Sequence, residues 1–122
     1  MSGAINKERF LALMGQYQKM NELDRVKLAK KMVAYNPDAR EYSLTNKCLL
    51  ALQKGLVGRY GGFHSWIKLG KIVRKGEKGF LIAAPCISKE EAKKPEDERI
   101  VRFFRHTSIF HESQTDSLPL KK

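Results

Sequence analysis

Apolar residues recur at helical spacing through the first part of the chain. Phe10, Leu13, Met14 and Tyr17 follow the i, i+3, i+4, i+7 pattern that places side chains on one face of a helix. The later apolar stretches are each followed by a residue that ends helices, namely Pro37, Gly55 and Gly70. The pattern predicts helices over about residues 5–19, 22–34, 44–55 and 63–69.

The second and third predicted helices begin at capping residues. Asn21 precedes two carboxylates, which complement the dipole at the start of a helix, and Ser43 precedes the Leu-rich stretch. The second helix would bury a stripe formed by Leu23, Val26, Ala29 and Val33. Its lysines would form a solvated face or, as the alternative, an accessory phosphate-contacting face.

After residue 71 the pattern changes to that of strands. Ile72 and Val73 lead into a polar turn, and the apolar run 80–87 is short and bounded as in a buried strand. Residues 100–110 predict a second strand that pairs back on the first as a hairpin. Between them, residues 88–99 contain nine charged side chains, which predicts a mobile connection. Residues after Thr115 show no pattern, and we expect 117–122 to form a flexible tail.

These elements predict a single α+β domain over residues 1–116, with N-terminal helices packed on a small antiparallel sheet. A chain of 122 residues can bury one core. Cys48 and Cys86 lie far apart in apolar surroundings, so both are expected to be reduced core thiols. No apolar run approaches the ~20 residues that span a bilayer, and no signal peptide is apparent. We therefore expect a cytoplasmic protein without a membrane partner.

The positive charge is concentrated in one segment. The chain carries a net charge of +11, which favours a polyanionic partner. Residues 59–79 hold six basic side chains and one acidic side chain. Glycines and aromatic residues also gather there, whereas acidic residues nearly cancel the basic ones after residue 80.

This segment has the composition of a single-stranded nucleic-acid site, in which cations hold phosphates and aromatic rings stack on bases. The candidate phosphate ligands are Arg59, Lys68, Lys71, Arg74, Lys75 and Lys78. The candidate stacking residues are Tyr60, Phe63, His64 and Trp66. Two structural alternatives remain open: Phe63 and Trp66 at helical spacing could belong to the core, and residues 74–76 could form a hairpin turn.

The last predicted strand repeats the combination of basic and aromatic side chains. Alternation along a strand places Arg102, Phe104 and His106 on one face and Arg105 on the other. We therefore add Arg102 and Arg105 as phosphate ligands and Phe104 as a stacking residue. The alternative is a buried Phe flanked by arginines that extend to solvent.

The sequence does not favour an enzyme. His64, His106 and His111 lack the spacing of a zinc site, and Thr115 stands where a His-Glu-x-x-His motif would need its second His. No nucleophile elbow or phosphate-binding Walker loop is present. We expect no catalytic residues, no metal ligands and no cofactor.

A set of motifs over residues 5–116 resembles the N-terminal domain of ArdC-type antirestriction proteins. The matching residues are Asn36-Pro37, Tyr42-Ser43, Asn46, residues 49–52, Trp66, Leu69-Gly70, the Val-Arg-Lys-Gly-Glu-Lys-Gly run at 73–79, Ile109-Phe110 and Gln114-Thr115. The run at 73–79, in register with the other pieces, is the most specific. Asn46 could serve the fold through a hydrogen bond.

The resemblance implies a single-stranded-DNA-binding module of mobile genetic elements, accessory to replication or transfer. The family often joins this module to a metalloprotease, primase or polymerase domain, and the sequence leads us to expect a stand-alone module without the metalloprotease. One alternative is an adaptor that docks on a DNA polymerase, primase or helicase through apolar residues of 5–34. A helix-turn-helix reader of duplex DNA, built from residues 22–34 and 44–55, is disfavoured by the Pro-containing connection.

Overall fold

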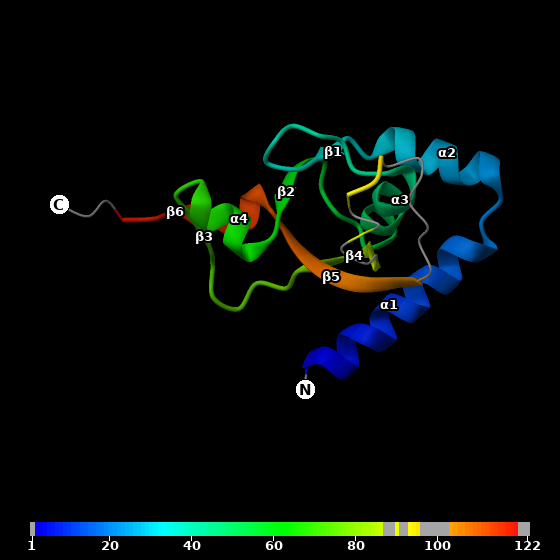
Figure 1. The fold of residues 1–122 in the computed structure, drawn as a ribbon, viewed down its shortest axis with the longest axis horizontal. Coiled ribbons are helices and arrows are strands. Elements are labelled where there is room, and N and C mark those ends of the chain that lie inside the picture. Colours follow the sequence, from blue (N-terminus) through cyan, green and yellow to red (C-terminus); the bar gives the residue numbers. More distant parts are fainter. Residues whose placement is uncertain (1, 87–89, 91–92, 96–102, 120–122) are drawn as a thin grey trace.

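A computed structural model of the chain describes residues 2–86, 90, 93–95 and 103–119 (Figure 1). The elements in order are α1 (Ser2–Lys19), α2 (Glu22–Lys31), β1 (Ala34–Tyr35), α3 (Leu44–Leu52), β2 (Gly58–Gly61), α4 (Phe63–Lys68), β3 (Lys71–Val73), β4 (Phe80–Cys86), β5 (Phe103–His111), the 3-10 helix η2 (Glu112–Gln114) and β6 (Thr115–Ser117). The α+β class is confirmed. Most of the predicted connection 88–99 lies outside the described residues.

The second helix is shorter than predicted. Asn21 caps α2 by accepting a 2.8 Å hydrogen bond from the Asp24 amide, but the helix ends at Lys31 and the chain turns into β1. The backbone is extended here because Ala34 and Tyr35 pair with β2, next to a 2.7 Å hydrogen bond from the Gly58 amide to the Val33 carbonyl. The predicted apolar stripe is therefore wrong at its ends, since Leu23 is 62% exposed and Val33 is 52% exposed. Strand β1 also separates α2 from α3, unlike the short turn of a helix-turn-helix.

The larger sheet has the strand order β1-β2-β5-β4. The predicted hairpin is confirmed, because β4 and β5 pair antiparallel with Phe80 opposite Ile109. Strand β2 pairs antiparallel with β5, placing Tyr60 opposite His111. The β1–β2 pair is parallel, so the sheet is mixed rather than purely antiparallel.

A second, two-stranded sheet joins β3 to β6, with Val73 opposite Thr115 and Lys71 opposite Ser117. The expected flexible tail over 117–122 is therefore wrong at Ser117, which is paired in β6. The alternative of a hairpin turn at 74–76 is also wrong, because β3 pairs with β6 while β4 pairs with β5. Residues 74–79 instead connect the two sheets.

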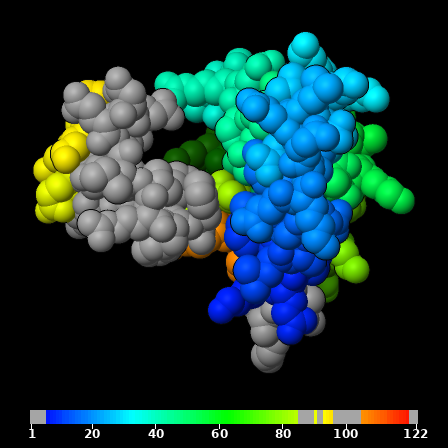
Figure 2. Space-filling model, turned by 90° about the vertical axis from the view of Figure 1, so that its right-hand side faces the viewer, coloured from blue at the N-terminus to red at the C-terminus, as the bar shows by residue number. Residues whose placement is uncertain are grey.

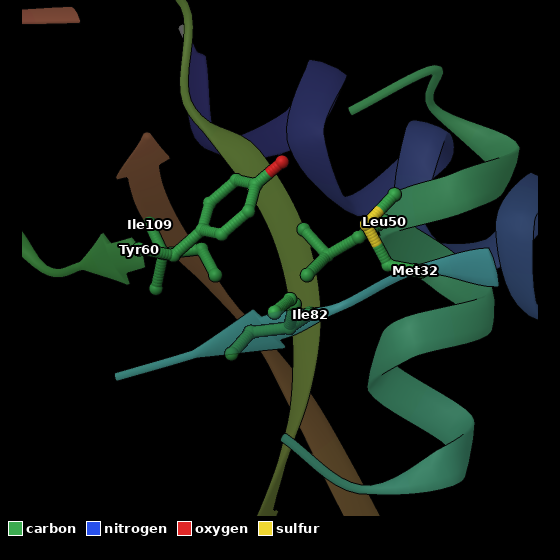
Figure 3. Close-up of a cluster of buried hydrophobic side chains, with 6 residues drawn as sticks. Met32, Leu50, Tyr60, Ile82 and Ile109 are labelled. Carbon is green, nitrogen blue, oxygen red and sulfur yellow. The ribbon is translucent and has the colours of Figure 1, made fainter. Parts of the chain in front are cut away.

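Two apolar clusters cover the two faces of the larger sheet. The cluster under α1 consists of Phe10, Leu13, Leu49, Leu81 and Ala83. The cluster on the other face consists of Met32, Ala34, Leu50, Tyr60, Ile82 and Ile109 (Figure 3). Neighbouring residues in β4 divide between the clusters because side chains alternate along a strand. Helix α3 contributes to both clusters, and α1 and α2 form the outer face at this end of the molecule (Figure 2).

Helix α3 also hydrogen-bonds to the outer strand β4 of the larger sheet. The Asn46 carboxamide accepts from the Ala83 amide at 2.8 Å and donates to the Ala83 carbonyl at 3.0 Å. Two turns later, Gln53 makes the same pair of bonds to Leu81, both at 2.8 Å. Asn46 therefore serves the fold, as the alternative for this residue anticipated.

Cysteine reactivity is limited in this fold. Cys48 is a free, fully buried thiol, and its Sγ lies 3.2 Å from the Arg25 carbonyl oxygen. Burial raises the pKa of this thiol. The side chain of Cys86 lies outside the described residues.

Candidate nucleic-acid interface

Two of the four predicted stacking residues in the 59–79 segment belong to the core. Tyr60 and Trp66 are fully buried. The Tyr60 hydroxyl donates to the Leu56 carbonyl at 2.6 Å, and Trp66 Nε1 donates to the Phe110 carbonyl at 3.0 Å. Neither ring presents a face to solvent, so their assignment to base stacking is wrong. The sequence offered the core as the alternative for Trp66.

Phe63 and His64 lie on the surface at the start of α4. Phe63 is 42% exposed, and the two rings meet edge to face with centroids 5.7 Å apart at 89°. Gly62, with extended backbone, precedes the helix, and both rings are exposed while Trp66 in the same helix is buried. These two side chains can contact an unpaired base.

Basic residues precede and follow this aromatic pair along the chain. Lys68 is in the last turn of α4, and Gly70 allows the chain to reverse with φ +78° before Lys71 enters β3. Arg59 lies half-buried in β2. Within the part of the chain that the structure describes, none of these three basic residues forms an ion pair.

Arg74 has a structural role. Its guanidinium donates to the Ser113 carbonyl at 2.6 Å, to Asp116 Oδ1 at 3.2 Å and to Glu77 Oε2 at 3.3 Å. The hydrogen bond with Asp116 is the main cause that raises the pKa of Arg74. These contacts tie the connecting segment to β6, so they favour a structural function over phosphate binding for Arg74.

Gln114 holds the same segment from the other side. Its amide nitrogen donates to the Lys78 carbonyl at 2.8 Å and to Glu77 Oε1 at 3.2 Å, while its oxygen accepts from the His111 amide at 2.8 Å. We call these contacts of Arg74, Glu77 and Gln114 the polar clip. The clip explains why the run at 73–79 and the Gln-Thr pair belong to one motif.

The polar clip presents two lysines to solvent. The Glu77 amide donates to the Arg74 carbonyl at 3.2 Å and Gly76 has φ +87°, which is the geometry of a type II turn with Lys75 at its tip. Lys75 and Lys78 are exposed, and among the described residues neither pairs with a carboxylate. Figure 1 shows this segment running from the α4 end of the molecule toward β4.

The predicted residues of the last strand are only partly described. Arg105 is exposed on β5. His106 points to the opposite face, where the centroid of its ring lies 5.8 Å from the ring centroid of Phe10 in α1. Arg102 and the side chain of Phe104 lie outside the described residues, so both assignments stay predictions.

His111 is a structural residue. Its Nδ1 accepts from the Ser113 amide at 3.0 Å, and its Nε2 lies 2.8 Å from the Val57 carbonyl oxygen, to which it donates as the Nε2–H tautomer. The residues described contain no cluster of three or more His, Cys, Asp or Glu that could hold a metal ion. They also contain no helix that is both long and apolar enough to cross a membrane.

Comparison with known sequences assigns this α+β domain to a family. Residues 13–110 match the sequence model of the family described as the N-terminal domain of anti-restriction factor ArdC. The chain belongs to this family. No curated protein sequence matches it.

Two crystal structures of the antirestriction protein ArdC from plasmid R388 share the fold. The metal-free structure superposes with a TM-score of 0.51 at 17% sequence identity, covering 75% of this chain and 35% of that one. For the Mn(II)-bound structure the TM-score is 0.52 at 20% identity, with coverages of 76% and 34%. The chain therefore spans about a third of the length of ArdC.

Proposed function

We propose that this domain binds single-stranded DNA with little sequence preference. Lys68, Lys71, Lys75 and Lys78 contact phosphates, assisted by Arg59 and Arg105, and Phe63 with His64 contacts bases. Arg102, as a further phosphate ligand, and Phe104, as a further stacking residue, remain part of the proposal. Membership in the ArdC N-terminal family supports this function, since single-stranded DNA binding is what the resemblance implies.

One observation carries the proposal: an exposed aromatic pair on α4 is followed along the chain by four lysines, Lys68, Lys71, Lys75 and Lys78, that have no carboxylate partner in the described structure. Exposed cations release counterions when they contact phosphates, and exposed rings stack on bases of any sequence. Phosphates and base faces are present in every sequence. The surface therefore favours an unpaired strand over a specific duplex site.

A titration of labelled oligonucleotides tests this function. Single-stranded DNA, duplex DNA and RNA of equal length would be compared by fluorescence anisotropy at two salt concentrations. We expect the single strand to bind most tightly, with a log–log salt slope of about 0.7 per phosphate contacted. Salt-independent binding, or tighter binding of the duplex, would contradict the proposal.

The biological setting we propose is replication or transfer of a mobile genetic element. The solved relative named above is an antirestriction protein of a plasmid. A module that coats unpaired strands would assist an element whose DNA passes through a single-stranded stage. Loss of this gene from its element should then lower the frequency of replication or transfer.

A second function, docking on a DNA polymerase, primase or helicase, is favoured by exposed apolar residues in the N-terminal helices. Leu11 on α1 is 59% exposed and Leu23 on α2 is 62% exposed. Co-purification of the element's replication enzyme, lost in Leu11→Ser and Leu23→Ser variants, would support docking. Negligible DNA binding by the isolated protein would make docking the main function.

A further inference from the structure

A groove of about 680 Å³ lies between α1, the connecting segment and β5. Its lining includes Asn6 and Arg9 from α1, Lys78 and Gly79 from the segment, and Phe110 from β5. Its volume is within the range of about 300–1,000 Å³ of small-ligand sites. Phe110 belongs to the motif of the family resemblance, but the sequence pattern did not indicate a contact between Phe110 and DNA. Asn6 and Arg9 belong to no motif or pattern that pointed to a function.

The aromatic floor of this groove is held in place by backbone contacts. Phe110 pairs with Gly61 in β2, and its carbonyl accepts the bond from Trp66. A Cβ at Gly79 would lie 3.0 Å from Ser108 Cβ and 3.3 Å from Phe110 Cε2. The main chain at Gly79 therefore runs directly against β5, and only Gly leaves this approach unobstructed.

The walls of the groove carry positive charge from two separate elements. Arg9 is exposed and makes a single long hydrogen bond to Asn6 Oδ1 at 3.3 Å. Lys78 projects from the segment whose backbone Gln114 fixes. Among the described residues of the lining, Glu77 supplies the one carboxylate, and it is already paired with Arg74 and Gln114. Arg9 and Lys78, which pair with no described carboxylate, therefore give the groove a positive charge.

We propose that the groove holds one nucleotide unit of the bound single strand, with the base against Phe110 and the flanking phosphates at Arg9 and Lys78. This proposal rests on the proposed function and specifies a subsite for it. Asn6 and Ser108 offer donors and acceptors to the base edge. Lys75, at the turn tip three positions before Lys78, continues the phosphate path toward Lys71 and α4.

The test compares an ordinary single-stranded oligonucleotide with an abasic one of equal length, because the latter keeps the phosphates and lacks the bases. Phe110→Leu preserves apolar packing against Gly79 but removes the aromatic face. We expect it to weaken binding of the ordinary strand by about ten-fold, as for loss of one base stack. On the abasic strand its affinity should match that of the unmodified protein.

Two further substitutions separate a phosphate contact from general charge. Arg9→Ala should lower the salt slope by about 0.7 on both oligonucleotides. Lys7→Ala removes an equal charge from the same helix at an exposed position outside the groove, so its slope should be unchanged. Phe110→Tyr keeps an aromatic ring and should bind as the unmodified protein. Unchanged binding of the abasic strand by Phe110→Leu shows that this variant is folded.

The outcomes distinguish the subsite from the function as a whole. If the unmodified protein binds single strands while Phe110→Leu and Arg9→Ala bind equally well, the subsite is wrong and the proposed function stands. If the unmodified protein does not bind single strands, both are wrong. If a free 5′-mononucleotide binds as tightly as the oligonucleotide, the groove is a free-nucleotide site and the strand subsite is wrong.

Discussion

Two regions of the molecule are stabilised in different ways. The body consists of α1–α3 and the larger sheet, and the α4 end consists of α4, β3 and β6. Every residue of the two apolar clusters belongs to the body. The α4 end buries Trp66 and Thr115, while Phe63, Ile67, Leu69 and Ile72 stay exposed. Side-chain hydrogen bonds of the polar clip hold this end in place. Stability and binding should therefore respond to different substitutions.

The largest effect is expected at Trp66, which joins the two regions. Trp66→Ala should lower the free energy of unfolding by about 3–5 kcal/mol, because it leaves a cavity and an unpaired Phe110 carbonyl. Urea unfolding followed by far-UV circular dichroism measures this change. Phe63→Ala, in the same helix but exposed, is the matched control. Equal stability of the two variants would contradict the role of Trp66 as the residue that joins the two regions.

Alkaline pH should destabilise the body through its buried tyrosines. Burial raises the pKa of Tyr60 to about 12. The unfolded chain loses this proton near pH 10, so stability is complete below pH 10 and declines as the pH approaches 12. Tyr60 would contribute a loss of roughly 2–3 kcal/mol over that range.

Urea titrations at pH 8, 10 and 11.5 measure the alkaline loss. Tyr60→Phe should show a smaller decline, although not a flat profile, because burial also raises the pKa of Tyr42 to about 12. An identical decline in this variant would show that Tyr60 does not carry the effect.

Asn46→Ala should lower the free energy of unfolding by about 2 kcal/mol. The substitution leaves the amide and carbonyl of Ala83 without their carboxamide partner. Gln16→Ala removes an exposed carboxamide from α1 and should leave stability nearly unchanged. Urea unfolding of the two variants at neutral pH makes the comparison, and a similar result for both would contradict the role of Asn46.

The smallest change in stability is expected for substitutions of Arg74 and Lys75. These two neighbours should also separate effects on stability from effects on DNA binding most clearly. Arg74→Ala opens the polar clip, so it should lower the melting temperature modestly and weaken DNA binding at the same time. Lys75→Ala should weaken binding and lower the salt slope by about 0.7 without changing the melting temperature. Thermal melts and anisotropy titrations of both variants would show this. Identical behaviour of the two would mean that Arg74 is a phosphate ligand after all.

Part of the body could be predicted from the sequence because its signals are local, although no pattern predicted strands β1 and β2 of its sheet. The β4–β5 hairpin follows from two bounded apolar runs, and the caps at Asn21 and Ser43 follow from residue type. The second helix is shorter than predicted because residues 34–35 pair with β2, and helical periodicity contains no information about that distant partner.

The α4 end could not be predicted in the same way, because its contacts are distant in sequence. Arg74 and Asp116 are 42 positions apart, and β6 forms only through its pairing with β3. Helical spacing put Phe63 and Trp66 together, yet one is exposed and the other fully buried. Which aromatic ring faces solvent depends on where β5 passes, and no local pattern contains that information.

The carboxamides of Asn46 and Gln53 have a consequence for the protein at high local concentration. A free edge strand is a template for joining the sheet of another molecule. Here α3 already occupies the amides and carbonyls of Leu81 and Ala83 that an incoming strand would need. Copies bound side by side on one DNA strand would therefore not aggregate by pairing their β4 edges.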